Sequence, residues 1–137
     1  MSKNPVVHFE MPYKDAKRVS EFYKSAFGWG MEPTNEEMGN YVIALTSDTD
    51  ENGMVKTPGT INGGFYDETH VPKPEDKTVH VVINVDDIEQ AKKDILAAGG
   101  TIKNDVMDIP GIGKYISILD TEGNAVGVLQ PTRPYLK

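Results

Sequence analysis

Apolar and polar side chains alternate along the first strand-like segment of the chain. Val7, Phe9 and Met11 share one face of this segment, whereas His8 and Glu10 share the other. A strand that runs into an amphipathic helix normally turns its apolar face towards that helix. The pattern therefore predicts that His8 and Glu10 lie on the face away from the helix, beside a polar ligand or a metal ion.

The segment that follows has the spacing of an amphipathic helix. Apolar residues recur at intervals of three and four positions from Val19 to Phe27. Asp15 precedes them as a candidate N-cap, and Gly28 follows as the residue that ends the helix. Trp29 comes next, and we expect its ring to fill the junction between the helix and the sheet; the alternative is a place at the rim of the cup.

The same order of elements occurs twice along the chain. After the first helix, we expect strands at residues 29–33, 40–46 and 59–66. The second set begins with a strand at 78–85 and a helix that begins after Asp87 and ends at Gly99-Gly100. It continues with strands at 101–108, 113–119 and 124–130. Gln90 stands three residues after Asp87, which is the spacing of a capping box. The sequence therefore predicts two β-α-β-β-β units in tandem.

Chemically distinctive residues keep one register between the two halves. Three pairs are each separated by 72 residues: His8 and His80, Asp15 and Asp87, and Gly28 and Gly100. Repetition at a fixed period indicates a duplicated structural unit. We therefore predict a single domain, 1–137, made of one module at 5–66 and another at 78–131. The proline-containing segment 67–77 is the expected linker.

Composition and charge narrow the classes of function. The chain has 137 residues, a net charge of −7 and no cysteine. The negative charge argues against nucleic acid or an anionic membrane as a partner, because no basic surface would release phosphate counterions. The absence of cysteine excludes disulfides, thiolate nucleophiles and cysteine-ligated metals. With no apolar leader and no apolar run long enough to span a bilayer, we expect a cytoplasmic protein.

Two segments resemble a known family. One runs from His8 through Phe22-Tyr23 to Phe27-Gly28-Trp29, and the other is the turn Asp120-Thr121-Glu122-Gly123-Asn124. They resemble the glyoxalase, bleomycin-resistance and extradiol-dioxygenase superfamily, also called the vicinal oxygen chelate proteins, and its bacterial FGW-type subgroup without an assigned reaction. The resemblance implies an α+β fold in which two tandem β-α-β-β-β modules form a cup of curved mixed sheets, with the helices outside. It also implies a small-molecule ligand in the cup and a homodimer.

The resemblance also bears on metal binding. Metal-dependent members of the family take His or Gln from the first strand of a module and Glu from its last strand. His8 and His80 match the two first-strand positions. Gly63 and Gly127 align with the two glutamate positions, so this chain departs from the family at both.

The residues themselves suggest another metal site. His8 and Glu10 lie two positions apart on one strand, hence on one face, and His80 is the repeat counterpart of His8. Two imidazoles and one carboxylate can form a facial triad for one divalent metal ion and leave positions open to a substrate. The alternative is that both histidines line the cup and hydrogen-bond a ligand or water. Glu10 is a candidate general base, or else a carboxylate paired at the strand edge.

Five further residues are candidates for contact with a substrate. Alternation places Tyr41, Tyr115 and Ser117 on the cup side of their strands. Tyrosines on strands also commonly serve in packing, which is the alternative for both rings. Gly63 and Gly127 would widen the cup for a flat or bulky guest.

Three functional hypotheses follow. The first is an enzyme that performs metal-assisted lyase, isomerase or dioxygenase chemistry on a small vicinal-oxygen substrate, with His8, Glu10 and His80 as ligands. The second is a metal-free binding protein, like the drug-sequestering members of the family, for which the acidic balance would suit a cationic guest. The third is an interaction subunit with a vestigial cup, in which the acidic loop 47–58 contacts the partner.

Overall fold

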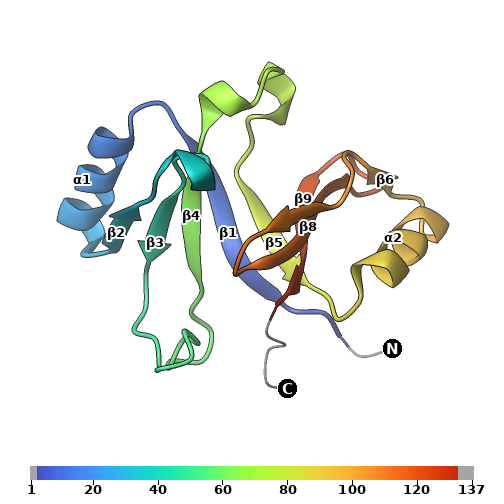
Figure 1. Ribbon diagram of the computed structural model, residues 1–137, viewed down its shortest axis with the longest axis horizontal. Coiled ribbons are helices and arrows are strands. Elements are labelled where there is room, and N and C mark those ends of the chain that lie inside the picture. Colours follow the sequence, from blue (N-terminus) through green and yellow to red (C-terminus); the bar gives the residue numbers. More distant parts are fainter. Residues whose placement is uncertain (1–2, 133–137) are drawn as a thin grey trace. The chain divides into compact units, whose positions relative to one another are not determined.

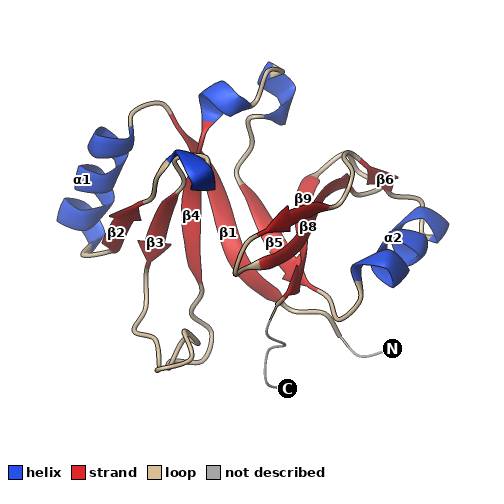
Figure 2. Ribbon diagram, viewed as in Figure 1, coloured by secondary structure: helices blue, strands red, loops and turns tan. Residues whose placement is uncertain are grey.

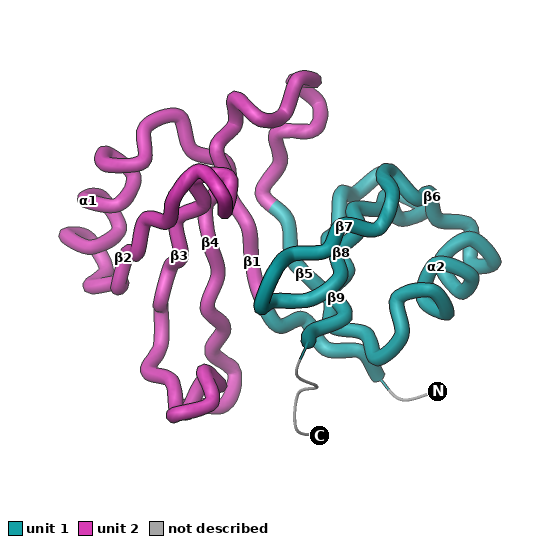
Figure 3. The backbone as a smooth tube through the Cα atoms, viewed as in Figure 1, with its two compact units in different colours: residues 1–7, 80–137 teal, residues 8–79 magenta. Residues whose placement is uncertain are grey.

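The computed structural model describes residues 3–132, and its chain divides into two compact units (Figure 3). The first module comprises His8–Val79. Of the described residues, the second module joins 80–132 to 3–7. The two histidines of the repeat therefore stand at the two boundaries between the units.

The first module is a four-stranded mixed sheet with one α-helix (Figure 1, Figure 2). Its elements are β1 (Val6–Tyr13), α1 (Ala16–Phe27), β2 (Gly30–Pro33), the 3-10 helix η1 (Glu36–Met38), β3 (Val42–Leu45), β4 (Asn62–Asp67) and the 3-10 helices η2 (Glu68–His70) and η3 (Pro74–Asp76). The strand order is β2-β3-β4-β1. β1 and β4 run parallel, whereas the other two pairs are antiparallel.

The core of the first module lies between this sheet and α1. Phe65 on β4 and Val42 on β3 are at most 1% exposed, and Phe9 and Met11 of β1 pack against the same cluster. Burying one side chain of this size stabilises the fold by about 1.5–3 kcal/mol. The apolar side of the β1 alternation is therefore the side that faces the helix.

The end of α1 is closed by aromatic stacking. Trp29 stacks on Tyr23, with 4.6 Å between ring centroids and 14° between ring planes, and its centroid is 5.6 Å from that of Phe9. The expectation that Trp29 fills the junction between helix and sheet is thereby confirmed. Not all of the apolar stripe of α1 is covered by the sheet. Phe22 and Phe27 belong to the stripe and remain 56% and 63% exposed.

Both ends of α1 are capped as the sequence predicts. The carboxylate of Asp15 accepts a hydrogen bond from the backbone N–H of Arg18 at 2.9 Å. Gly28 takes the left-handed conformation, with φ of 72°, and its N–H bonds back to the last turn. None of the helices within residues 3–132 is long and apolar enough to cross a membrane.

The second module repeats the plan with one additional strand. Its elements are β5 (His80–Asn84), α2 (Ile88–Ala97), β6 (Thr101–Ile102), β7 (Met107–Ile109), β8 (Gly113–Leu119) and β9 (Ala125–Pro131). The strand order is β5-β9-β8-β6, and β7 also pairs with β8. β5 and β9 run parallel, whereas β8 is antiparallel to each of its neighbours.

The strand expected at 101–108 is divided into β6 and β7 where a side chain of this segment bonds to β8. The backbone N–H of Ser117 on β8 donates to the side-chain Oδ1 of Asn104 at 2.7 Å. A side-chain oxygen thus takes the place that a backbone carbonyl would hold in a continuous ladder. The chain leaves the sheet after Ile102 and returns to it at Met107.

The core of the second module lies between its sheet and α2. Ile88, Ile116 and Val128 are at most 2% exposed and belong to one cluster. Asp87 caps α2 by accepting from two backbone N–H groups, whereas the side chain of Gln90 bonds to Asp94 rather than closing a capping box. The α+β class and the two β-α-β-β-β modules with mixed sheets agree with the sequence prediction, which is confirmed.

We expect that Asp15→Ala lowers the free energy of unfolding by about 1 kcal/mol, because α1 loses the acceptor for its first free N–H groups. Asp15→Asn is the matched control, since its amide oxygen can still accept. Urea denaturation followed by circular dichroism would measure both changes. Equal losses in the two variants would show that the cap contributes nothing.

Candidate functional site

The sheet of the first module has one apolar and one polar face. Phe9 packs on the helix side, so alternation turns its neighbours His8 and Glu10 to the other side. Glu10 lies opposite Gly64 in the parallel pairing of β1 and β4, and Phe65 next to it is buried in the core. Four residues define what we call the polar face of the first module: His8, Glu10, Tyr41 and Tyr66.

A side-chain hydrogen bond joins two of these residues. The Nε2 atom of His8 and the hydroxyl of Tyr41 are 2.8 Å apart. Their rings are close to parallel, with 18° between the planes and 6.4 Å between the centroids. The direction of the bond depends on which ring nitrogen of His8 carries the proton. The pair can therefore offer either a donor or an acceptor to the oxygen of a third molecule.

The backbone around Tyr41 is fixed by several hydrogen bonds. Asn40 adopts the left-handed conformation with φ of 55°, which asparagine tolerates better than most residues. The hydroxyl of Tyr13 donates to the Asn40 carbonyl at 2.8 Å. The backbone N–H and the Oγ1 of Thr34 both donate to the Tyr41 carbonyl, at 2.9 and 2.5 Å. The Tyr41 ring is thus held in place before any ligand arrives.

Tyr66 borders the same face and binds the end of the linker. Its hydroxyl donates to the Thr78 carbonyl at 2.6 Å and accepts from the Thr78 N–H at 2.9 Å. Burial raises the pKa of Tyr66 above its ordinary value of 10.0, and the negative charges of Glu10 and Glu68 raise it further. The influence of Glu10 on this pKa agrees with a carboxylate on the Tyr66 side of the sheet.

The Gly63-Gly64 pair is divided between the two faces of the sheet. Gly63 lies opposite Phe9, and a Cβ placed on it would be 2.5 Å from carbons of the Phe9 ring, so Gly63 belongs to the helix side. A Cβ on Gly64 would overlap the Tyr41 ring on the polar face. The sequence alignment that put Gly63 on the cup side is therefore one residue out. Gly63 widens no cup, because aromatic rings fill the space beside both glycines.

Strand pairing identifies the counterpart of Gly64 in the second module. Gly127 pairs with Val82 on β5 and Ser117 on β8, as Gly64 pairs with Glu10 on β1 and Ile43 on β3. These pairings equate Gly64 with Gly127 and place Ser117 on the face away from Ile116 and Ile118, which lie in the core. Val82 is the counterpart of Glu10, so the second module has no carboxylate at that position.

Tyr115 covers Gly127 as Tyr41 covers Gly64. A Cβ on Gly127 would lie 2.9 Å from two ring carbons of Tyr115 and still closer to its hydroxyl. Gly127 therefore does not widen a cup either. His80 opens β5 and is half-buried on the same side of its strand as Val82. The second module thus carries His80, Tyr115, Ser117 and Gly127 of the predicted residues, and the first carries His8, Glu10 and Tyr41.

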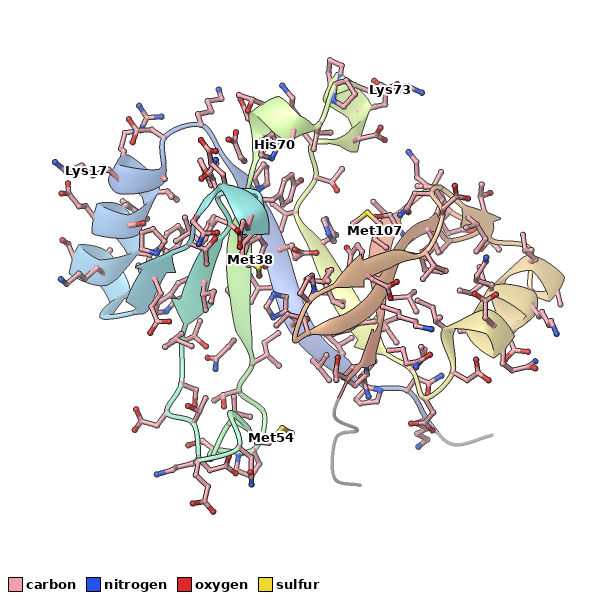
Figure 4. The ribbon with its side chains drawn as sticks, in the orientation of Figure 1. Lys17, Met38, Met54, His70, Lys73 and Met107 are labelled. Carbon is pink, nitrogen blue, oxygen red and sulfur yellow. The ribbon has the colours of Figure 1, made fainter. Side chains whose placement is uncertain are left out.

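The predicted metal ligands do not fit a metal site within either module. Throughout residues 3–132, no three His, Asp or Glu side chains are grouped closely enough to hold a metal ion. The first module supplies His8 and Glu10. The Nε2 atom of His8 already forms a hydrogen bond with the Tyr41 hydroxyl. A cation at that nitrogen would have to displace Tyr41. The third histidine, His70, lies on η2 beside Asp67, and its side chain is 56% exposed (Figure 4).

Sequence reasoning missed Tyr66 as a member of the candidate site and chose Gly63 in place of Gly64. The signal for Tyr66 was present, because it alternates with the apolar Phe65 on β4. Its bond to Thr78 was not visible, since the eleven intervening residues have no regular pattern. The choice between Gly63 and Gly64 needed the register of β4 against β1, which adjacent glycines do not reveal.

The chain belongs to the glyoxalase/bleomycin resistance protein/dioxygenase superfamily. The sequence model of that family matches residues 6–128 of the chain. The first module and the second module are thus both parts of the family fold, as the sequence resemblance implied. No curated protein matches the chain.

Solved structures with this fold include methylmalonyl-CoA epimerases. The Streptomyces coelicolor enzyme in complex with 2-nitronate-propionyl-CoA is 18% identical, with a TM-score of 0.68 over 96% of this chain and 100% of that one. A hypothetical protein from Bacillus halodurans C-125 is 15% identical, with a TM-score of 0.67 over 99% and 100% of the two chains. The epimerase of Mycobacterium tuberculosis is 15% identical, with a TM-score of 0.64 over 93% and 88%. These similarities establish the fold and leave the reaction open.

We expect the raised pKa of Tyr66 to appear in the stability of the protein at alkaline pH. The folded state holds the neutral phenol more strongly than the unfolded chain does, so this contribution is complete below pH 10 and is lost as the pH rises through the raised pKa. Tyr66→Phe should therefore show a shallower fall in unfolding free energy between about pH 9 and pH 11.

Urea unfolding across that pH range would test the difference. At neutral pH the same variant should be less stable by about 1–3 kcal/mol, since the N–H and carbonyl of Thr78 lose their partner. Burial also raises the pKa of Tyr13, so Tyr13→Phe should show a shallower fall as well and serves as the comparison at a second buried tyrosine. A slope identical in wild type and Tyr66→Phe would contradict the interpretation.

Proposed function

We propose that the protein binds a small organic metabolite on the polar face of its first module without a metal ion. The observation that supports this most directly is the 2.8 Å hydrogen bond between His8 Nε2 and the Tyr41 hydroxyl. His80, Tyr115, Ser117 and Gly127 are the corresponding candidates in the second module. The membership of the chain in the glyoxalase/bleomycin resistance protein/dioxygenase superfamily does not depend on this proposal.

The chemistry of the polar face suits a ligand with an oxygen atom. The His8–Tyr41 pair can donate to a carbonyl or accept from a hydroxyl, because one proton is shared between two groups that each donate and accept. Glu10 adds a carboxylate that accepts from a hydroxyl or an ammonium group. Such a set of a few fixed polar groups beside a packed core is typical of sites for small molecules.

A metal-dependent reaction is a weaker candidate for this chain. The family carboxylate positions hold Gly64 and Gly127, and tyrosine rings fill the space beside them. The set of His8, Glu10 and His80 would still need the Tyr41 hydroxyl to leave His8 Nε2. We therefore assign no step to a metal ion.

Glu10 favours a second candidate function, proton transfer at carbon. A carboxylate on the same face as a phenol–imidazole pair can take the proton from a carbon next to a carbonyl, and the resulting enolate oxygen can accept a hydrogen bond from Tyr41 or His8. Return of the proton to that carbon from Glu10 completes the cycle. Structural neighbours that bind acyl-CoA compounds supply a natural set of trial substrates. A homodimer in the cytoplasm remains our expectation for the assembly and its location.

Calorimetric titration with pyruvate, propionyl-CoA and methylmalonyl-CoA would test binding. We expect at least one of these carbonyl compounds to bind equally well with and without EDTA. His8→Ala and Tyr41→Phe should weaken that affinity about tenfold, the effect of losing one hydrogen bond to a polar ligand group.

His70→Ala is the matched control, because His70 is exposed on η2 and lies outside the polar face. It should leave the affinity unchanged. Loss of binding on adding EDTA, equal effects of His8→Ala and His70→Ala, or no binding of any of the three compounds would contradict the proposal.

Proton transfer predicts exchange of hydrogen for deuterium at the α-carbon of methylmalonyl-CoA in deuterated water. Proton NMR would record the loss of the α-hydrogen signal. Glu10→Gln should slow this exchange by about a hundredfold or more, since general-base contributions are of that size. Glu68→Gln, which alters another carboxylate near Tyr66, should have little effect. Exchange that persists in Glu10→Gln would exclude Glu10 as the base.

A further inference from the structure

Gly64 stands at the centre of the polar face, although its backbone does not require glycine. It is absent from the residues with positive φ, so an alanine could adopt its conformation. The obstacle is space, because a Cβ on Gly64 would overlap three atoms at the hydroxyl end of Tyr41. The absence of a side chain at Gly64 is therefore what allows the Tyr41 ring to lie across β4.

The same arrangement occurs in the second module. Gly127 has no positive φ, and a Cβ on it would meet the hydroxyl end of Tyr115. Each tyrosine lies two residues before the strand partner of its glycine, Ile43 for Tyr41 and Ser117 for Tyr115. Two independent strand pairs thus combine a bare glycine with a tyrosine that covers it.

We propose that the Gly64–Tyr41 pair determines what the first module binds, by placing a tyrosine hydroxyl where a glutamate would make a cation site. A carboxylate side chain at position 64 would project from the same face as His8 and Glu10, next to Glu10 across the β1–β4 pairing. Gly64 removes that carboxylate and admits the Tyr41 ring, which then holds His8 Nε2 at 2.8 Å. The Gly127–Tyr115 pair has the same role in the second module.

The consequence is a choice between two classes of ligand. A divalent cation needs negatively charged or lone-pair ligands that point at one position, whereas the Tyr41 hydroxyl lies at His8 Nε2 and shares a hydrogen bond with it. The polar face therefore selects an organic molecule with a carbonyl or hydroxyl oxygen over a bare cation. This choice of ligand rests on the proposed function, but the exclusion of cations does not.

The proposal predicts that two substitutions create a metal site. In Tyr41→Ala/Gly64→Glu, the ring is removed and the first module gains a third ligand beside His8 and Glu10. Titration of the apoprotein with Zn²⁺ alone, by isothermal calorimetry, should show affinity at least about tenfold higher than for wild type. Tyr41→Ala/Gly64→Ala is the matched control and should bind Zn²⁺ no better than wild type. Adding His8→Ala to the metal-binding variant should abolish the gain.

Two results would overturn the proposal. One is wild-type protein that binds one Zn²⁺ per chain through His8 as tightly as the double variant does. The other is a double variant that is folded by circular dichroism and gains no affinity for Zn²⁺. Failure of wild type to bind any carbonyl compound would contradict the proposed function and leave this test unaffected.

A double-mutant cycle on stability keeps the proposal testable if the glutamate variant does not fold. Gly64→Ala should lower the Tm in the wild-type background, because its Cβ overlaps Tyr41, and should lower it much less in the Tyr41→Ala background. Equal shifts in the two backgrounds would show that Gly64 does not act through Tyr41. Gly63→Ala serves as the comparison, since its Cβ meets Phe9 and its effect should not depend on Tyr41.

Discussion

The polar face of the first module depends on one steric constraint, the space above Gly64. With no side chain there, the Tyr41 ring lies across β4 and its hydroxyl reaches His8 Nε2 at 2.8 Å. Hydrogen bonds from Tyr13 to the Asn40 carbonyl and from Thr34 to the Tyr41 carbonyl fix the backbone that carries this ring. The absence of a side chain at Gly64 on β4 thus allows Tyr41, which precedes β3, to contact His8 of β1 before any ligand is present.

This constraint links the fold to the chemistry. The helix-facing side of the sheet is filled by Phe9, Phe65 and their neighbours, so polar groups are displaced to the opposite side. Tyr41, His8 and Glu10 supply a hydroxyl, an imidazole and one carboxylate on that side, and position 64 adds no further carboxylate to them. The superfamily fold is retained, and the polar groups of this face are the ones that we propose bind an organic oxygen ligand.

Much of the fold could be predicted from the sequence, and the reasons are local. Asp15, Gly28 and Asp87 act at helix ends through their own backbone neighbours, and the 72-residue register exposed the duplication. The faces of His8, Glu10 and Tyr41 followed from strict alternation. What failed was non-local: the register that separates Gly63 from Gly64, and the Asn104 side chain that interrupts the strand at 101–108. Adjacent glycines carry no side-chain pattern from which a register could be read.

We propose that Tyr41, placed by the absence of a side chain at Gly64, occupies a nitrogen of His8 that would otherwise be open to a metal ion. Nitrogen-15 NMR of the histidine rings during addition of one equivalent of Zn²⁺ tests this directly. We expect the His8 Nε2 resonance to stay unchanged in wild type and to shift in Tyr41→Ala/Gly64→Glu. A shift of His8 Nε2 in wild type to the position seen in that variant would contradict it.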